Sequence, residues 1–216
     1  NLQLRFMKQP SFIRLAFTGF LLTIFTYVHA QQYIINPSTD GGFEGTHGWT
    51  ILNTSNINKW IIGADTKSAG SSAAFISNNN STNTLTNPQA TNSKIYLYKD
   101  VVVPLTANSI SISFKYKNAG TSTPAPRCMF ELASAFPALP TDGLSALQGG
   151  EFLTFLNNQT GWTTYTNTNP LSADRPLTYQ SQALIPGATY RIVFEWSAAN
   201  QTSLIQQPPM CTLPSS

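Results

Sequence analysis

The stretch SISISFKYK, from Ser109 to Lys117, alternates polar and apolar side chains at every position. In an extended strand, successive side chains point to opposite faces, so the two isoleucines, Phe114 and Tyr116 would share one face. The serines and lysines would share the other. This pattern is typical of an antiparallel strand with one buried face, and it predicts a sheet that packs on a hydrophobic core.

The stretch from Thr189 to Trp196 repeats this alternation, with four large apolar residues on one face. Leu177–Leu184 precedes it, and Pro186 and Gly187 between the two suit the central positions of a type II turn. The sequence therefore predicts a hairpin of Leu177–Leu184 with Thr189–Trp196.

Further short segments have strand character and are separated by residues rich in Asn, Gly, Ser and Pro. They are Trp49–Leu52, Lys59–Ile62, Ala73–Ser77, Ser93–Val103, Arg127–Ala133, Glu151–Leu156 and Gly161–Thr166. About ten short strands without a convincing amphipathic helix predict an all-β fold, a two-sheet antiparallel jelly-roll β-sandwich.

Residues 1–30 have the pattern of a secretory signal peptide. Basic residues precede an apolar run from Leu15 to Tyr27, and Val28-His29-Ala30 forms a small-residue cleavage pattern before Gln31. The apolar run is short for a membrane span, so we expect the leader to be cleaved, with no membrane insertion afterwards. The protein would be secreted or held at the cell surface.

Charge excludes one class of partner. The leader carries three of the twelve Lys and Arg residues, which leaves nine against nine acidic residues. A mature chain with a net charge of about zero lacks the basic excess that nucleic-acid binding requires, so we expect no nucleic-acid partner.

Catalytic residues are sparse. His47 is the one histidine outside the leader, and no Gly-x-Ser-x-Gly elbow accompanies it. Paired carboxylates are the stronger enzymatic alternative, because Glu131, Glu151 and Glu195 lie on predicted strands. Glycosidases need two such groups about 5–10 Å apart. We expect the chain not to be an enzyme, since strand carboxylates of a sandwich more often face solvent.

Aromatic residues offer a different chemistry, because flat rings match the apolar faces of sugars. Trp49, Trp60 and Trp196 fall on predicted strand faces that build the core. Tyr98 and Tyr165 have polar neighbours, and we expect them to be exposed and to contact a ligand.

Several segments together resemble the jelly-roll adhesin modules related to MAM domains, the cleaved-adhesin or choice-of-anchor-J type of secreted bacterial surface proteins. The resemblance spans roughly Ile34 to Trp196 and is carried by Gly41-Gly42-Phe43-Glu44-Gly45, Gly48-Trp49-Thr50, Trp60-Ile61-Ile62-Gly63, Ala69–Ser77, Ile95–Val101, Ile112–Lys117, Trp162 and Thr189–Trp196. It implies the same sandwich and a binding role outside the cell.

Asp40, Glu44 and Asp100 are candidate ligands of a structural calcium ion, which takes carboxylate and carbonyl oxygens from irregular, glycine-rich backbone. The resemblance implies a calcium near the Gly-Phe-Glu motif and so points to Glu44. In the alternative interpretation, Asp40 caps a turn and Glu44 pairs with a surface lysine.

The end of the chain departs from the family pattern. The resemblance implies a closing strand with an Asp-Asn-Ile motif, and no such motif follows Trp196. We therefore expect residues 31–200 to form the module without its final strand, which would leave one sheet edge unpaired. We expect residues 201–216 to be an irregular tail, as in a truncated or frameshifted reading frame. Cys128 and Cys211 leave the existence of a disulfide open.

These observations predict a secreted, non-catalytic adhesion or carbohydrate-binding module, part of a larger extracellular protein, with an extracellular glycan or surface protein as its partner. The alternative is a secreted polysaccharide hydrolase of lectin-like fold that uses paired carboxylates.

Overall fold

The structure is a computed structural model that describes residues 32–54, 57–84, 93–107, 109–118, 126–134, 138–142, 151–155, 159–167, 184–198, 206–207 and 214–215. The chain divides into two units, Asn1–Ala30 and Gln31–Ser216, and all described residues belong to the second. The predicted leader lies outside them. The described residues form strands, turns and bends without a helix, and thus include no helix of the length and apolarity that a membrane crossing requires.

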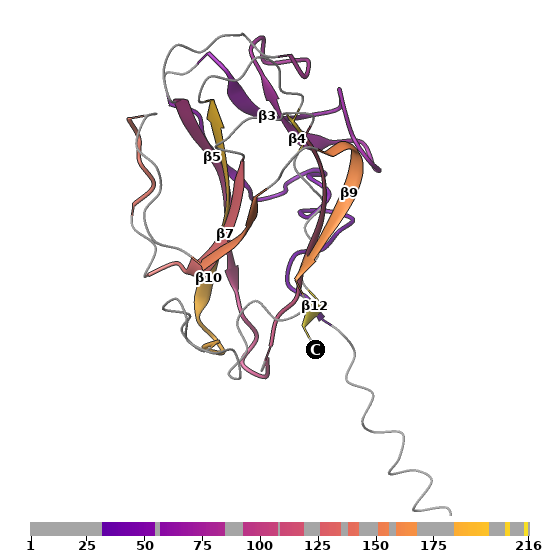
Figure 1. Ribbon diagram of the computed structural model, residues 1–216. Helices are drawn as coiled ribbons and strands as arrows, with labels where there is room; N and C mark the ends of the chain where they lie inside the picture. The colour runs from indigo at the N-terminus through magenta and orange to yellow at the C-terminus, as the bar shows by residue number, and fades with distance from the viewer. Residues whose placement is uncertain are drawn as a thin grey trace, which may run out of the picture. The chain divides into compact units, whose positions relative to one another are not determined.

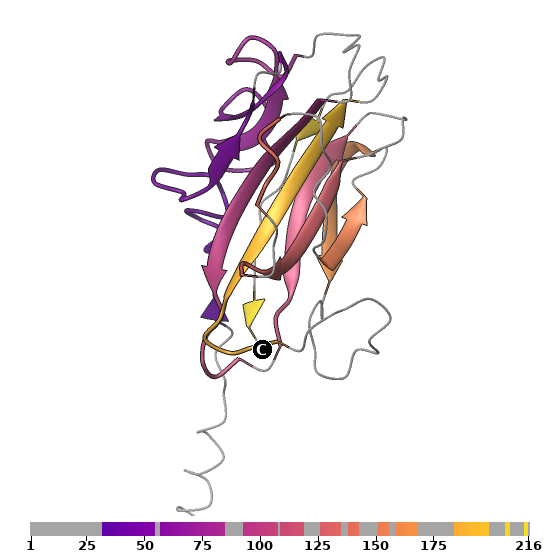
Figure 2. The same cartoon turned by 90° about the vertical axis from the view of Figure 1, so that its left-hand side faces the viewer.

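Five strands form the larger sheet in the order β2-β5-β10-β7-β8, and every pairing is antiparallel (Figures 1 and 2). Its strands are β2 (Thr50–Leu52), β5 (Ser93–Val102), β7 (Arg127–Leu132), β8 (Glu151–Phe155) and β10 (Thr189–Ala198). β10 lies in the middle and pairs with β5 along its whole length.

The remaining described strands form a three-stranded sheet of order β11-β6-β9 and two short ladders. The three-stranded sheet contains β6 (Ile112–Asn118), β9 (Gln159–Asn167) and β11 (Gln206–Gln207). The ladders pair β3 (Lys59–Gly63) with β4 (Ala73–Ser77), and β1 (Gln32–Tyr33) with β12 (Pro214–Ser215).

The apolar faces of the two larger sheets meet in one core. Phe114 of β6 packs edge-on against Phe194 of β10, with ring centroids 5.2 Å apart. Ile110, Ile112 and Tyr116 are buried beside Phe114, as the alternation of the opening stretch predicts. Each such side chain contributes about 1.5–3 kcal/mol through burial. The predicted all-β, two-sheet antiparallel β-sandwich is therefore confirmed.

The predicted hairpin before β10 is wrong, although its turn forms. The amide of Ala188 donates to the carbonyl of Ile185 at 3.1 Å, and Gly187 has the positive φ of 79° that a type II turn requires. β10, however, is bordered by β5 on one side and β7 on the other from Tyr190 to Glu195. Both of its edges are taken, so no third strand can pair there; residues 177–183 lie outside the described part.

The last residues are not wholly irregular, in contrast to the prediction for 201–216. β11 pairs with Lys117 and Asn118 of β6, and β12 pairs with β1. Two very short strands of the tail thus join the described sheets. Cys128 is buried on the core side of β7, while Cys211 lies outside the described residues, so the disulfide stays an open question.

Candidate functional site

Figure 2 looks onto the outer face of the larger sheet, which points away from the core. This face carries polar and aromatic side chains in cross-strand rows. The first row contains Asp100 of β5, Arg191 of β10 and Glu131 of β7. Two further rows follow along the strands, and residues opposite one another in a pair of antiparallel strands have Cα atoms about 4.5–5.5 Å apart. The second row is Tyr98, Val193 and Met129, and the third is Tyr96, Glu195 and Arg127.

The third row and most of the second row are covered. Val193 and Met129 of the second row and Tyr96 of the third are buried, and Leu139, from the segment after β7, packs against this cluster. Because this half of the outer face is closed by apolar contacts, a ligand would have to bind toward the first row.

A buried ion pair occupies the covered half. The guanidinium of Arg127 donates to both carboxylate oxygens of Glu195, at 3.0 and 2.8 Å, and the Glu195 side chain is only 3% exposed. Burial, and then the negative charge of Glu195, raise the pKa of Tyr96, so this phenol stays protonated. Glu195 is therefore held by Arg127 and is not available to a reaction in solution.

A second ion pair lies in the open first row. Arg191 donates from Nε and Nη2 to the two oxygens of Asp100, at 2.6 and 2.8 Å, and its guanidinium lies 4.6 Å above the centre of the Tyr98 ring. The hydrogen bond to Asp100 raises the pKa of Arg191, so the group stays charged. The Asp100 side chain is 41% exposed, which places this pair at the surface.

The exposed residues around this pair form what we call the open end of the outer face. Glu131, which is partly exposed, faces Arg191 in the register, and no ion pair between the two occurs among the described residues. Val102 is 61% exposed, and Thr50 and Thr189 add hydroxyl groups. The open end consists of Thr50, Tyr98, Asp100, Val102, Glu131, Thr189 and Arg191. It spans about 14 Å along the strands and about 14 Å across them.

Tyr98 and Tyr165 occupy different environments. Tyr98 lies partly exposed in the open end. Tyr165 is also partly exposed, but its ring packs on Phe114 with centroids 4.9 Å apart, on the core side of β9. Its polar neighbours Thr164 and Thr166 are the outward residues, so the predicted exposure of Tyr165 was assigned to the wrong face. The ligand role of Tyr98 stays a prediction.

The three candidate calcium ligands do not converge on one cation. Asp40 accepts a hydrogen bond from the Asn36 amide at 2.7 Å and pairs with the Lys99 ammonium at 3.4 Å. Glu44 accepts from the amides of Ser71 and Ser72. Asp100 is taken by Arg191 on the other face of β5. The described residues contain no group of three or more His, Cys, Asp or Glu side chains suited to a metal, so the carboxylates present do not fit a shared calcium site.

His47 belongs to the same N-terminal segment and has no catalytic geometry. Its Nδ1 accepts a hydrogen bond from the Trp49 amide at 3.2 Å, and its carbonyl accepts one from Lys99 at 2.9 Å. Burial, and then the charge of Lys99, lower its pKa. The contacts of His47 therefore anchor the segment rather than activate a nucleophile.

Glu131 and Glu195 are not arranged as a catalytic pair. Glu131 is opposite Arg191, whereas Glu195 is opposite Arg127, four residues farther along β10. This offset separates them by about 14 Å, beyond the range that glycosidase chemistry uses. The side chain of Glu151 lies outside the described part.

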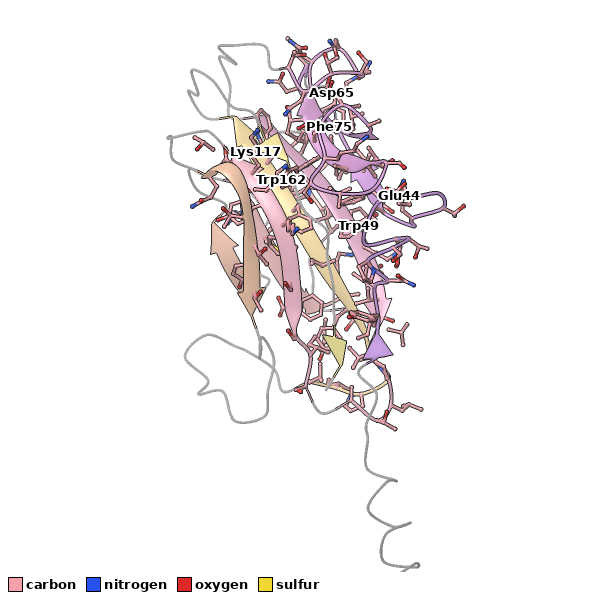
Figure 3. All side chains as sticks on the ribbon, turned by 90° about the vertical axis from the view of Figure 1, so that its right-hand side faces the viewer. Glu44, Trp49, Asp65, Phe75, Lys117 and Trp162 are labelled. Atoms are coloured by element: carbon pink, nitrogen blue, oxygen red, sulfur yellow. The ribbon has the colours of Figure 1, made fainter. Side chains whose placement is uncertain are left out.

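The outer face of the other sheet has a different character. Lys115, Lys117 and Trp162 lie on it, and Figure 3 shows Lys117 and Trp162 on this side of the molecule. No acidic partner of either lysine occurs among the described residues. Sequence reasoning placed Lys115 and Lys117 outward correctly, but it missed Arg191, whose importance depends on a carboxylate 91 residues away in the chain.

No family model matches the sequence, and no curated protein sequence matches it. Among solved structures, the chain is similar to TmCBM61 in complex with β-1,4-galactotriose, at 10% identity and a TM-score of 0.48, over 86% of this chain and 99% of that one. It is similar to the C-terminal family 22 carbohydrate-binding module of Clostridium thermocellum Xyn10B, at 11% identity and a TM-score of 0.39, over 79% and 87%. It is also similar to the enzymatically active domain of tailspike protein 4 of bacteriophage CBA120, at 12% identity and a TM-score of 0.45, over 85% and 21%.

Proposed function

We propose that the chain is a secreted, non-catalytic glycan-binding module that contacts its ligand through the open end of the outer face. The observation that carries the proposal is the row of Asp100, Arg191 and Glu131 beside the Tyr98 ring, exposed on a sheet face whose other half is closed. Such a surface combines charged hydrogen-bonding groups with apolar area, as sugars require. The resemblance to adhesin modules and the predicted leader support a binding role outside the cell.

The chemistry of the open end suits hydroxyl groups. Glu131 can accept hydrogen bonds from sugar hydroxyls, and Arg191 keeps the N–H groups of Nη1 after Asp100 has taken Nε and Nη2. Tyr98 and Val102 offer apolar contact to the C–H faces of a pyranose. These groups sit on strands of a paired sheet, so little ordering entropy is lost when a ligand binds.

The register supports binding over hydrolysis. A hydrolase would need a second carboxylate close to Glu131. Glu195 is distant and held by Arg127, and Asp100, about 10 Å away in the same row, is held by Arg191. The hydrolase alternative would have to release Asp100 from Arg191 or use residues outside the described part.

A glycan array with the purified chain beginning at Gln31, together with a hydrolysis assay on the same sugars, tests the proposal. We expect retention of at least one glycan without turnover. Glu131→Gln and Tyr98→Ala should each weaken retention by about tenfold, the loss expected from one hydrogen bond to a charged group or one buried ring contact.

Lys115→Gln provides the matched control, because Lys115 is exposed on the other sheet and should leave retention unchanged. Turnover that disappears in Glu131→Gln would support the hydrolase instead. Absence of both retention and turnover for every glycan would leave a structural spacer or a module for a surface protein.

A further inference from the structure

We infer that Asp100 restricts the open end to uncharged glycans, because it neutralises the Arg191 guanidinium and occupies one of the two edges with which this group could bind an anionic sugar. This inference rests on the proposed glycan-binding function. It assigns Asp100 the role of a specificity-determining residue and names neutral oligosaccharides as the ligand class.

Asp100 and Arg191 form a bidentate ion pair. A guanidinium binds a carboxylate or sulfate best through two parallel N–H groups, and Asp100 already takes Nε and Nη2 of Arg191 in this way, at 2.6 and 2.8 Å. The Tyr98 ring covers one face of the same guanidinium. What remains of the guanidinium is the edge formed by Nη1 and the second N–H of Nη2, and its positive charge is already balanced by the Asp100 carboxylate.

The first row carries an excess of negative charge. Arg191 is the one cation that the described residues place in the open end, and Asp100 and Glu131 lie on either side of it. The row thus has one negative charge in excess. It extends over two strand spacings, about 10 Å, which is close to the screening length of about 8 Å at physiological ionic strength. A uronic acid or a sulfated sugar on this row would meet Glu131 without a compensating cation.

The Asp100 carboxylate, which neutralises Arg191, is itself exposed. The Asp100 side chain is 41% exposed, so an amide of the same shape can replace it without burying a new polar group. Asp100→Asn would release the Nε and Nη2 edge of Arg191 and remove the excess negative charge together.

The experiment measures binding of two probes of equal length, a neutral xylo-oligosaccharide or galacto-oligosaccharide and an oligogalacturonate, by calorimetry at low and physiological salt. For the unchanged protein we expect the neutral probe to bind and the oligogalacturonate to bind at least tenfold more weakly. In Asp100→Asn the ratio of anionic to neutral affinity should rise by about tenfold or more, and most strongly at low salt. Asp100→Glu keeps the pair and should keep the original ratio.

Lys115→Gln with Lys117→Gln serves as the control for the basic face of the other sheet, and it should leave the ratio unchanged. Asp100→Ser, which removes the carboxylate entirely, repeats the test with a second side chain. A ratio that stays the same in both Asp100→Asn and Asp100→Ser overturns the inference while leaving glycan binding intact. Binding of neither probe class, nor of any glycan on the array, overturns the proposed function and this inference with it.

Discussion

Lys99 shows how a single side chain can organise an irregular segment. Its ammonium donates to the His47 carbonyl and pairs with Asp40, and it is 13% exposed. Gly48 lies beside it with a positive φ of 62°, where an added Cβ would come within 2.8 Å of the Lys99 nitrogen. The positive φ therefore favours glycine at this position of the Gly-Trp-Thr motif, and any larger residue would also displace the Lys99 ammonium from its contacts.

The contacts of Lys99 lead to a prediction about calcium. We expect a chelator to leave the melting temperature unchanged, because Asp40, Glu44 and Asp100 are each satisfied by a separate donor. Lys99→Met should lower stability by about 1–3 kcal/mol, since it leaves Asp40 and the His47 carbonyl without their cationic partner. Thermal unfolding of the unchanged protein with EDTA and with added calcium checks the first expectation. Thermal unfolding of Lys99→Met beside the unchanged protein checks the second. A fall in melting temperature with EDTA that calcium restores would support the sequence-based calcium prediction instead.

His47 predicts a dependence of stability on pH. Burial, and then Lys99, hold its pKa in the folded protein below the ordinary value of 6.5. The unfolded chain therefore binds more protons than the folded one between these two pKa values. The contribution of neutral His47 to the free energy of unfolding is fully present above pH 6.5 and is lost as the pH falls through the folded-state pKa.

Melting curves between pH 7.5 and 4.5 for the unchanged protein and for His47→Asn test this prediction. Asparagine keeps an acceptor near the Trp49 amide but does not titrate in this range. The difference between the two curves should appear only below about pH 6.5. Parallel curves over the whole range would show that protonation of His47 does not affect folding.

At the scale of elements, the local pattern predicted strands and faces but not partners. Ala73–Ser77 coincides with β4, and the apolar sides of β6 and β10 are those that alternation indicates. Alternation describes one strand at a time, so it carries no information about which strand lies beside it. The hairpin failed for that reason: sequence neighbours were assumed to pair, whereas β10 pairs with two strands more than fifty residues earlier in the chain.

The ion pair that joins β7 to β10 should behave as a coupled unit. Arg127→Met leaves the Glu195 carboxylate almost fully buried without its partner and should cost about 2–4 kcal/mol. Arg127→Met combined with Glu195→Gln removes the buried charge and should cost less than the single change. Denaturant unfolding of both single variants and the double variant measures the coupling.

Lys115→Met, at an exposed position of β6, is the control and should change stability by no more than about 0.5 kcal/mol. Costs for Arg127→Met and Glu195→Gln that simply add would show that the pair contributes no coupling between the two strands.

At the scale of the whole molecule, composition and alternation predicted the sandwich, while the candidate site depends on how its strands are ordered. Tyr98 was predicted as a contact from its polar neighbours, and it lies in the open end. Arg191 and Glu131 could not be placed beside it, because their proximity follows from the order β5-β10-β7. Tyr165 also has polar neighbours but points to the core, so neighbour polarity alone does not distinguish the two faces of a sheet.

The same order of strands gives the tail a structural role that its composition did not predict. β11 pairs with the end of β6, and β12 pairs with β1, so the tail contributes two antiparallel ladders. Deletion of residues 201–216 should remove both. With net contributions of about 0.5–1.5 kcal/mol for each backbone hydrogen bond, we expect a loss of about 2 kcal/mol, or about 4–8 °C in melting temperature.

Gln206→Pro combined with Gln207→Pro separates the two ladders, because proline removes the N–H donors of β11 and leaves β12 intact. The melting temperature of this variant should fall by roughly half as much as that of the deletion variant. Replacement of both glutamines by Thr keeps the donors in residues that favour strands, and should preserve the melting temperature. An unchanged melting temperature after deletion would mean that the sandwich is held by its core and its larger sheets alone.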